Sequence, residues 1–468
     1  MRTSLSISFL ITLSFLLGYA RDLLVAWRYG GTWMADSFFV ALLLPSFFEN
    51  LLGITLRDAV IPYLYALRQK GLDILQQQFR RLQLFVWTTG FGVAAVVVLG
   101  ATLWLKLLMP GWESKQISEF LWVFRLAGAL IFVQTVLCFQ TAVFNYAGRF
   151  VLPVTRTVLS NICAIGVLFY TGKSVGSVIA GILFGQFFLL AVMRFMLKKV
   201  LLTHHAVGDP LSSARPSLII YLMPLLIVTF SQQICFVVER ILCSYMAEGS
   251  IAKMSYAYRI AIIPMTLYIF SALSLIYPRL SLSWLRRQNE DFVQLLHYGV
   301  VLTLVFLAPA AVVLTSASSS VVTLLFQRGA FGPEQTIVTA SLLSVYGFGP
   351  PAVGMTLFCG RILVLMGKGR QFAALAVLSA LSIICIDIAV YDTYGVLGLA
   401  VSYVVCNWIQ ALISLILIAR YVPTFQPWGS LVRWIGACLL VYCGVLITMT
   451  SNFGWMKLLL TCASVFAA

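Results

Sequence analysis

Charged residues are scarce in this sequence. Only 10% of its 468 residues are Asp, Glu, Lys or Arg, whereas 61% are hydrophobic. Soluble globular domains carry about 25% charged residues, because they present a polar surface to water. The shortage therefore excludes an ordinary soluble fold and predicts an integral membrane protein.

Residues that serve metal sites and disulfides are also few. The sequence has three histidines, and its ten cysteines include no Cys-x-x-Cys pair. Neither a zinc site nor a disulfide framework is therefore expected. No phosphate-binding GxxxxGK[ST] loop and no HExxH helix occurs, and the loops are too short to house a catalytic domain. We expect a transporter without a cofactor rather than an enzyme.

Long apolar runs are what the sequence has in abundance. About 20 apolar residues are needed for a helix to cross the hydrocarbon core of a membrane. Thirteen runs are long enough: 4–28, 33–66, 82–108, 118–146, 151–171, 174–197, 217–245, 251–280, 294–317, 335–366, 370–391, 394–420 and 431–450. The short stretch 454–468 is a candidate fourteenth. The predicted fold class is an all-α polytopic membrane protein with 13–14 transmembrane helices.

The basic residues, which give a net charge of +16, are spread over the loops between these runs. This distribution excludes a nucleic-acid-binding patch. Cytoplasmic loops of membrane proteins are enriched in Lys and Arg. Counting loop charges places the N-terminus in the cytoplasm, with Arg68, Lys70, Arg149 and Arg286 inside and Lys115 outside.

Related residues recur at nearly constant spacing along the chain. Pro45 and Pro264 are 219 residues apart, Gly111 and Gly329 are 218 apart, and Asp22 and Glu239 are 217 apart. The spacing predicts two pseudo-symmetric six-helix lobes of parallel orientation, 1–200 and 216–420. Residues 201–215 form the cytoplasmic linker and 421–468 add C-terminal helices. Parallel repeats with a site at their interface are typical of transporters.

Several charged residues lie inside the apolar runs, where a charge costs at least about 2.5–3.5 kcal/mol. Such residues usually pair or line a polar cavity, so they are candidate site residues. An arginine in a cavity suits an anionic ligand, because its guanidinium binds phosphate oxygens in a bidentate manner. The candidates for substrate binding are Arg21, Asp22, Asp36, Glu49 and Arg259. For Arg21, Asp22 and Asp36 the alternative is simple pairing near the headgroups.

Three segments together resemble the MurJ (MviN) lipid II flippase family. They read LGYARDLLVAWRYGGTWMADSFFVALLLP, VVERILCSYMAEGSIAKMSYAYRIAIIP and LLFQRGAFGPE, in that order. The resemblance implies a fourteen-helix bundle that turns over a polyprenyl-diphosphate-linked glycan in the cytoplasmic membrane by alternating access. It implies that Arg21, Asp22, Asp36 and Arg259 face a central cavity or its outer gate.

The resemblance also implies a cation site and possible partners. Some relatives bind sodium, and Glu239, Asp387 and Ser402 correspond to that site here. Both sodium and protons stay open as coupling ions, and for Asp387 the alternative is a neutral, protonated carboxyl. Glycosyltransferases of the same pathway are candidate partners, beside membrane lipids and the lipid-linked glycan.

The sequence departs from the family at several cavity positions. Phe15 stands where relatives have arginine, and Phe48-Glu49-Asn50 stands where they have an arginine pair. Gly53 replaces a glutamate and Tyr258 replaces an aspartate. These losses leave open whether the glycan is that of lipid II or of a related envelope or exopolysaccharide intermediate. Two other functions also stay open: a cation-coupled multidrug exporter of the same superfamily, and a non-transporting scaffold for envelope synthesis.

Overall fold

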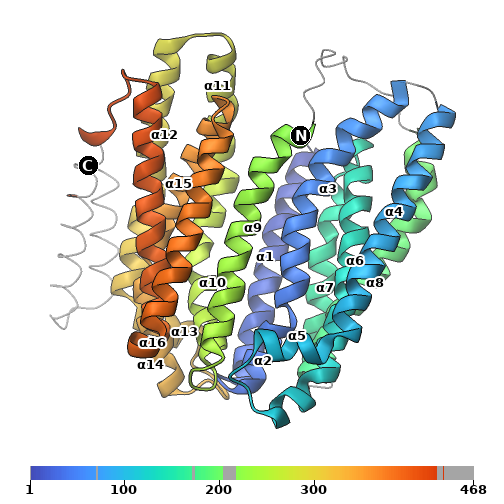
Figure 1. The fold of residues 1–468 in the computed structure, drawn as a ribbon, viewed down its shortest axis with the longest axis vertical. Coiled ribbons are helices and arrows are strands. Elements are labelled where there is room, and N and C mark those ends of the chain that lie inside the picture. Colours follow the sequence, from blue (N-terminus) through green and yellow to red (C-terminus); the bar gives the residue numbers. More distant parts are fainter. Residues whose placement is uncertain (1, 70–71, 171–173, 204–217, 430–435, 437–468) are drawn as a thin grey trace. The chain divides into compact units, whose positions relative to one another are not determined.

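A computed structural model describes residues 2–69, 72–170, 174–203, 218–429 and 436. Every regular element within these ranges is helical, so the predicted all-α class is confirmed (Figure 1). The two predicted spans 431–450 and 454–468 lie outside the described residues, as does most of the predicted linker.

The described helices fall into two compact units. The first comprises residues 1–252 and 328–331, and the second comprises 253–327 and 332–468. The predicted lobe boundary at 201–215 lies before this division, because α9 packs against α3 and α5 of the first unit. The lobes derived from the sequence repeat stay a prediction.

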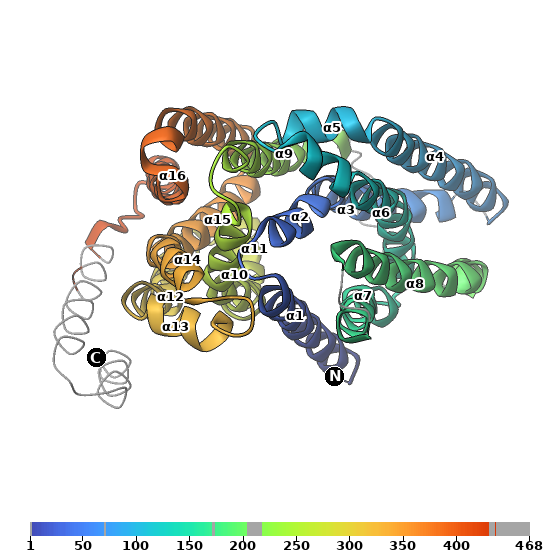
Figure 2. The same ribbon diagram turned by 90° about the horizontal axis from the view of Figure 1, so that it is seen from below.

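The first unit holds nine helices of the described chain. They are α1 (Arg2–Tyr29), α2 (Trp33–Ala41), α3 (Leu43–Gln69), α4 (Leu72–Leu99), α5 (Ala101–Leu108), α6 (Ser114–Tyr146), α7 (Val151–Tyr170), α8 (Val175–Thr203) and α9 (Leu218–Cys243). Helix α6 is the most enclosed: it packs against α3, α4 and α8, and Figure 2 shows it between them. A continuous cluster of buried side chains from these four helices forms the core.

Helices α7 and α8 approach each other closely. Gly181 and Gly185 are four residues apart on α8 and face the backbone of α7; a Cβ atom on Gly185 would lie 2.7 Å from Ser160 Cα. Small residues at this spacing allow membrane helices to pack backbone to backbone. This contact fixes the position of α7, which carries several of the site residues described below.

The second unit is built from the remaining helices. They are α10 (Ser250–Tyr268, which begins in the first unit), the π-helix Ile269–Leu273, α11 (Ser274–Leu285), α12 (Asn289–Ser316), α13 (Ser318–Phe326), α14 (Pro333–Tyr346), α15 (Gly349–Leu365) and α16 (Gly369–Tyr421). Helix α15 packs against both α12 and α16.

Two irregularities in this unit bear on the predicted spans. The continuous segment α16 contains a kink at Gly395, whose φ of 56° only glycine adopts readily, so it comprises two helices as predicted. Pro264 lies inside the predicted span 251–280, and because proline disfavours a helix interior a break is expected there; this expectation is wrong. Helix α10 continues past this proline, and the irregular turn is the π-helix that follows Tyr268.

Eleven helices of the described chain are long and apolar enough to cross a membrane. One of them is the 53-residue α16, which its kink divides into two. The spans predicted between residues 4 and 420 therefore each have a helical counterpart.

Candidate substrate-binding site

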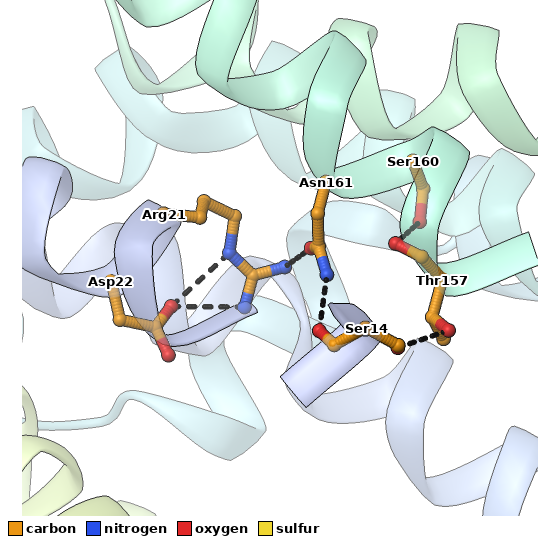
Figure 3. Close-up of polar contacts among 6 residues, drawn as sticks. All are labelled: Ser14, Arg21, Asp22, Thr157, Ser160 and Asn161. Carbon is orange, nitrogen blue, oxygen red and sulfur yellow. Dashed lines mark hydrogen bonds and ion pairs between the residues drawn. The ribbon is translucent and has the colours of Figure 1, made fainter. Parts of the chain in front are cut away.

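The seam between α1 and α7 contains the first predicted charged pair (Figure 3). Arg21 donates from Nε and Nη2 to Asp22 Oδ1, at 3.1 and 2.9 Å. Its Nη1 donates to Asn161 Oδ1 on α7 at 3.1 Å. The Asp22 side chain is only 1% exposed, and a buried carboxylate requires such partners because desolvation of an unpaired charge is costly.

The polar seam continues toward the beginning of α1. Asn161 donates from Nδ2 to the carbonyl oxygen of Ser14 at 3.4 Å, and the Ser14 hydroxyl donates to Thr157 (Figure 3). Thr157 and Asn161 are four residues apart, so they lie on one face of α7. The polar contacts along this face extend from Arg21 to a pocket that Ser14 and Thr157 also line.

A pocket of about 550 Å³ lies between α1, α3, α6 and α7. Its charged lining residues are Glu49 and Arg156, which form an ion pair through Glu49 Oε1 and Arg156 Nη2. Arg156 Nη1 also lies 3.9 Å from the sulfur of Cys138. Phe15 lines the same pocket. The predicted site residue Glu49 thus has a cation as its immediate partner.

Asp36 has a structural role in the same unit. Its side chain is buried, and its two carboxylate oxygens accept hydrogen bonds from the backbone N–H groups of Gly249 and Ala252, both at 2.7 Å. These donors are at the N-terminus of α10, where helical N–H groups have no partner within the helix. Asp36 therefore caps α10 from α2, and its negative charge suits the positive end of the helix dipole.

The backbone around this cap is packed without room for side chains. A Cβ atom on Gly249 would lie 1.6 Å from the carbonyl oxygen of Gly31, and one on Gly111 would lie 2.1 Å from that of Ser244. The N–H of Ala330 donates to the carbonyl oxygen of Trp27 at 2.9 Å. The end of the first unit predicted to face outward is thus closed by direct backbone contact.

The remaining predicted substrate residue, Arg259, belongs to the second unit and is half-buried on α10. The neighbouring Tyr258 ring makes edge-to-face contacts with Tyr346 at 5.7 Å and Tyr403 at 5.8 Å between centroids. The expected proximity of Arg259 to Arg21, Asp22 and Asp36 across a lobe interface stays a prediction.

Two of the three predicted cation ligands lie together. The Ser402 hydroxyl donates to Asp387 Oδ1 across the kink of α16, and both side chains are buried. Glu239 is buried on α9 in the other unit. Among the described residues, no group of three or more His, Cys, Asp or Glu side chains could hold a metal ion. Sodium binding stays a prediction.

The sequence reading missed Arg156 and Asn161. Both are polar residues inside the predicted span 151–171. The cost of a charge in the membrane marks Arg156 as a candidate in the same way as the other charged residues. Their partners Glu49 and Arg21 are 107 and 140 residues away in the chain, so the pairing itself carries no local signal.

A sequence profile described as "Lipid II flippase MurJ" matches residues 25–466, which is most of the chain. The chain belongs to this family. The probable lipid II flippase MurJ of Aquifex aeolicus (strain VF5) is 26% identical over 361 residues, which cover 75% of this chain and 69% of that protein. The MurJ family consists of transporters, so this multi-pass membrane protein is a transporter rather than an enzyme.

Solved structures share the fold. A lipid II flippase MurJ in an inward closed conformation is 20% identical, with a TM-score of 0.83 over 98% of this chain and 97% of its own. An inward-facing multidrug resistance MATE family transporter of the MOP superfamily is 14% identical, with a TM-score of 0.71 over 88% and 95% of the two chains. At these identities the likeness concerns the fold alone.

Proposed function

We propose that this chain is a flippase for a polyprenyl-diphosphate-linked glycan, either lipid II or a related cell-envelope intermediate. It would move this lipid across the cytoplasmic membrane by alternating access, with its N-terminus inside. The observation that carries the proposal is the polar α1–α7 seam together with the pocket beside it, which place two arginines, Arg21 and Arg156, within an apolar bundle. Guanidinium groups at membrane depth suit a diphosphate.

The family supports a lipid-linked substrate, and the lining of the pocket bears on which lipid it is. Phe15 and Glu49 line the pocket, at and beside positions that are cationic in the family. The pocket is thus less basic than the resemblance implies, which favours a headgroup that needs fewer cationic contacts.

Transport in proteoliposomes tests the proposal. The purified full chain would be reconstituted with fluorescent lipid II or with an undecaprenyl-diphosphate-linked oligosaccharide, and outward movement measured by membrane-impermeant quenching. We expect quenching of at least one substrate faster than in protein-free vesicles. If neither lipid moves faster than in those vesicles, the flippase function is wrong.

A second candidate function is cation-coupled export of drugs, because carboxylates also occupy the interior at Glu49 and Asp387. Cationic drugs need acidic walls, whereas Arg156 neutralises Glu49 in the first unit. Uptake of a fluorescent cationic drug into the same proteoliposomes, together with no lipid movement, would favour this function. A non-transporting scaffold would show neither activity.

A further inference from the structure

The polar pocket of the first unit has the size of a ligand site. Its volume of about 550 Å³ falls within the roughly 300–1,000 Å³ that is common for small-molecule sites. Besides the ion pair, hydroxyl and amide groups face it from four helices: Ser14, Asn50, Thr141, Asn145 and Thr157. Hydrogen-bonding groups around a single guanidinium are the lining that a phosphate group requires.

The guanidinium of Arg156 has donor capacity beyond its present contacts. It has five N–H donors; Glu49 accepts from Nη2, and the Cys138 sulfur, a weak acceptor, lies near Nη1. The Arg156 side chain is 17% exposed and that of Glu49 is 28% exposed. Glu49 can therefore turn away from the arginine without crossing the packed core.

We infer that Arg156 binds the diphosphate of the lipid-linked substrate and that Glu49 is its counter-ion in the empty pocket. The inference rests on the proposed function. A diphosphate carries more negative charge than a carboxylate and offers oxygens for both arms of the guanidinium, so it displaces Glu49. Because one anion replaces another, Arg156 is never left buried without a partner, which would be strongly unfavourable.

The position of the pocket fits loading of a substrate from the cytoplasm. Apart from Glu49 and Asn50 of α3, its lining comes from the first half of α1, the last turns of α6 and the first turns of α7. These segments lie at the end of the first unit that the loop charges place inside, opposite the end closed around Gly111 and Gly249. From there the hydrogen-bonded seam leads to the Arg21–Asp22 pair.

The competing explanation is a purely structural ion pair that joins α3 to α7. The two explanations differ in the sign of one effect. A structural pair loses stability, and binding with it, when either partner is neutralised. A resident counter-ion competes with the ligand, so its neutralisation strengthens binding, whereas neutralisation of the arginine weakens it.

Binding of farnesyl diphosphate to the purified full chain in detergent tests the inference. We expect Arg156→Gln to weaken binding at least tenfold and Glu49→Gln to strengthen it several-fold. Arg149→Gln is the matched control, because Arg149 is an exposed arginine in the turn just before α7, and it should leave binding unchanged. Farnesol should not bind measurably, and inorganic pyrophosphate should bind more weakly than farnesyl diphosphate.

The outcomes separate the possibilities. If both Glu49→Gln and Arg156→Gln weaken binding, or if neither changes it, the inference is overturned. Equal affinity for pyrophosphate and farnesyl diphosphate would make the pocket a site for a free anion and would overturn its assignment to a lipid. Melting temperatures measured in parallel show whether Arg156→Gln has unfolded, and Glu49→Gln tests the inference independently because it should gain affinity.

Transport separates this inference from the proposed function. If the wild-type chain moves a glycan lipid but Arg156→Gln leaves farnesyl diphosphate binding unchanged, the diphosphate site lies elsewhere and the flippase function stands. If binding depends on Arg156 and Glu49 as expected but no glycan lipid moves, the anion site stands and the flippase function fails.

Discussion

At the scale of single residues, carboxylates inside the apolar bundle have identifiable donors. Asp22 accepts from Arg21, Asp36 accepts from the backbone of α10, Glu49 accepts from Arg156 and Asp387 accepts from Ser402. A buried charge without a donor is costly to retain, so a donor by itself does not indicate a ligand site. What distinguishes a ligand site from a structural pair is an adjoining pocket, and Glu49 with Arg156 has one.

Substitutions of Arg259 test whether the second unit takes part in substrate binding. If it holds a diphosphate, Arg259→Ala should lower lipid transport about tenfold or more, because charge-assisted hydrogen bonds contribute about 1.5–3 kcal/mol each. Arg259→Lys keeps the charge but loses the planar fork, so it should retain part of the activity. Arg279→Ala, at an exposed arginine of the same unit, is the control. Normal transport by a well-expressed Arg259→Ala protein would remove Arg259 from the substrate site.

A substitution of Asp387 tests whether sodium is the coupling ion. If Asp387 and Ser402 bind sodium, transport should depend on a sodium gradient, and Asp387→Asn should abolish that dependence. The matched control is Asp392→Asn, which removes an exposed carboxylate from the same helix. Transport would be compared in proteoliposomes with inward, outward and no sodium gradients. An unchanged gradient dependence in Asp387→Asn would leave Asp387 as a hydrogen-bonding partner of Ser402.

At the scale of helices, the site depends on how closely α7 can approach its neighbours. Thr157 and Asn161 reach α1, while Ser160 and another side of α7 lie against Gly181 and Gly185 of α8. Lipid offers no hydrophobic drive for helix association, so this packing relies on close van der Waals contact. A side chain added at the contact should therefore affect both stability and the α1–α7 seam.

Gly185→Ala tests this contact. The added Cβ would lie 2.7 Å from Ser160 Cα and 3.0 Å from the Leu159 carbonyl oxygen, so backbone must move. We expect a loss of about 1–3 kcal/mol in stability, as for other overpacked cores, measured as a lower melting temperature in detergent. Gly166→Ala on α7 is the matched control, since nothing lies within 4 Å of its added Cβ. An equal or higher melting temperature for Gly185→Ala would contradict the close contact.

At the scale of the whole molecule, the loop charges and the first unit agree on which segments share an end. The turns around Gly30, Gly111, Gly249 and Gly329 meet one another, and the positive-inside rule assigns them to the outer side. Helix α6 has 33 residues, about 50 Å at 1.5 Å per residue. It therefore separates Lys115 from Arg149 by the full thickness of a membrane.

Labelling of single cysteines tests this orientation. A cysteine at Lys115 or Gly332 should react with a membrane-impermeant maleimide added outside intact cells, and one at Arg149 should react only after permeabilisation. Lys70 and Gly208, which lie outside the described residues, are also expected inside. Inverted labelling at Lys115 and Arg149 would reverse the predicted topology and place the Arg156 pocket on the wrong side for loading from the cytoplasm.

The sequence by itself determined the class of fold, most spans and the residues worth testing. Hydrocarbon thickness sets the length of an apolar run, and the cost of a charge in lipid marks Arg21, Asp22, Asp36, Glu49 and Asp387 wherever they fall. Only the tertiary structure decided their partners. The Glu49–Arg156 and Arg21–Asn161 contacts join residues more than 100 positions apart, and the Asp36 cap joins α2 to α10. These pairings follow from which helices pack together, and packing depends on small residues and shape complementarity that a single chain's hydropathy does not reveal.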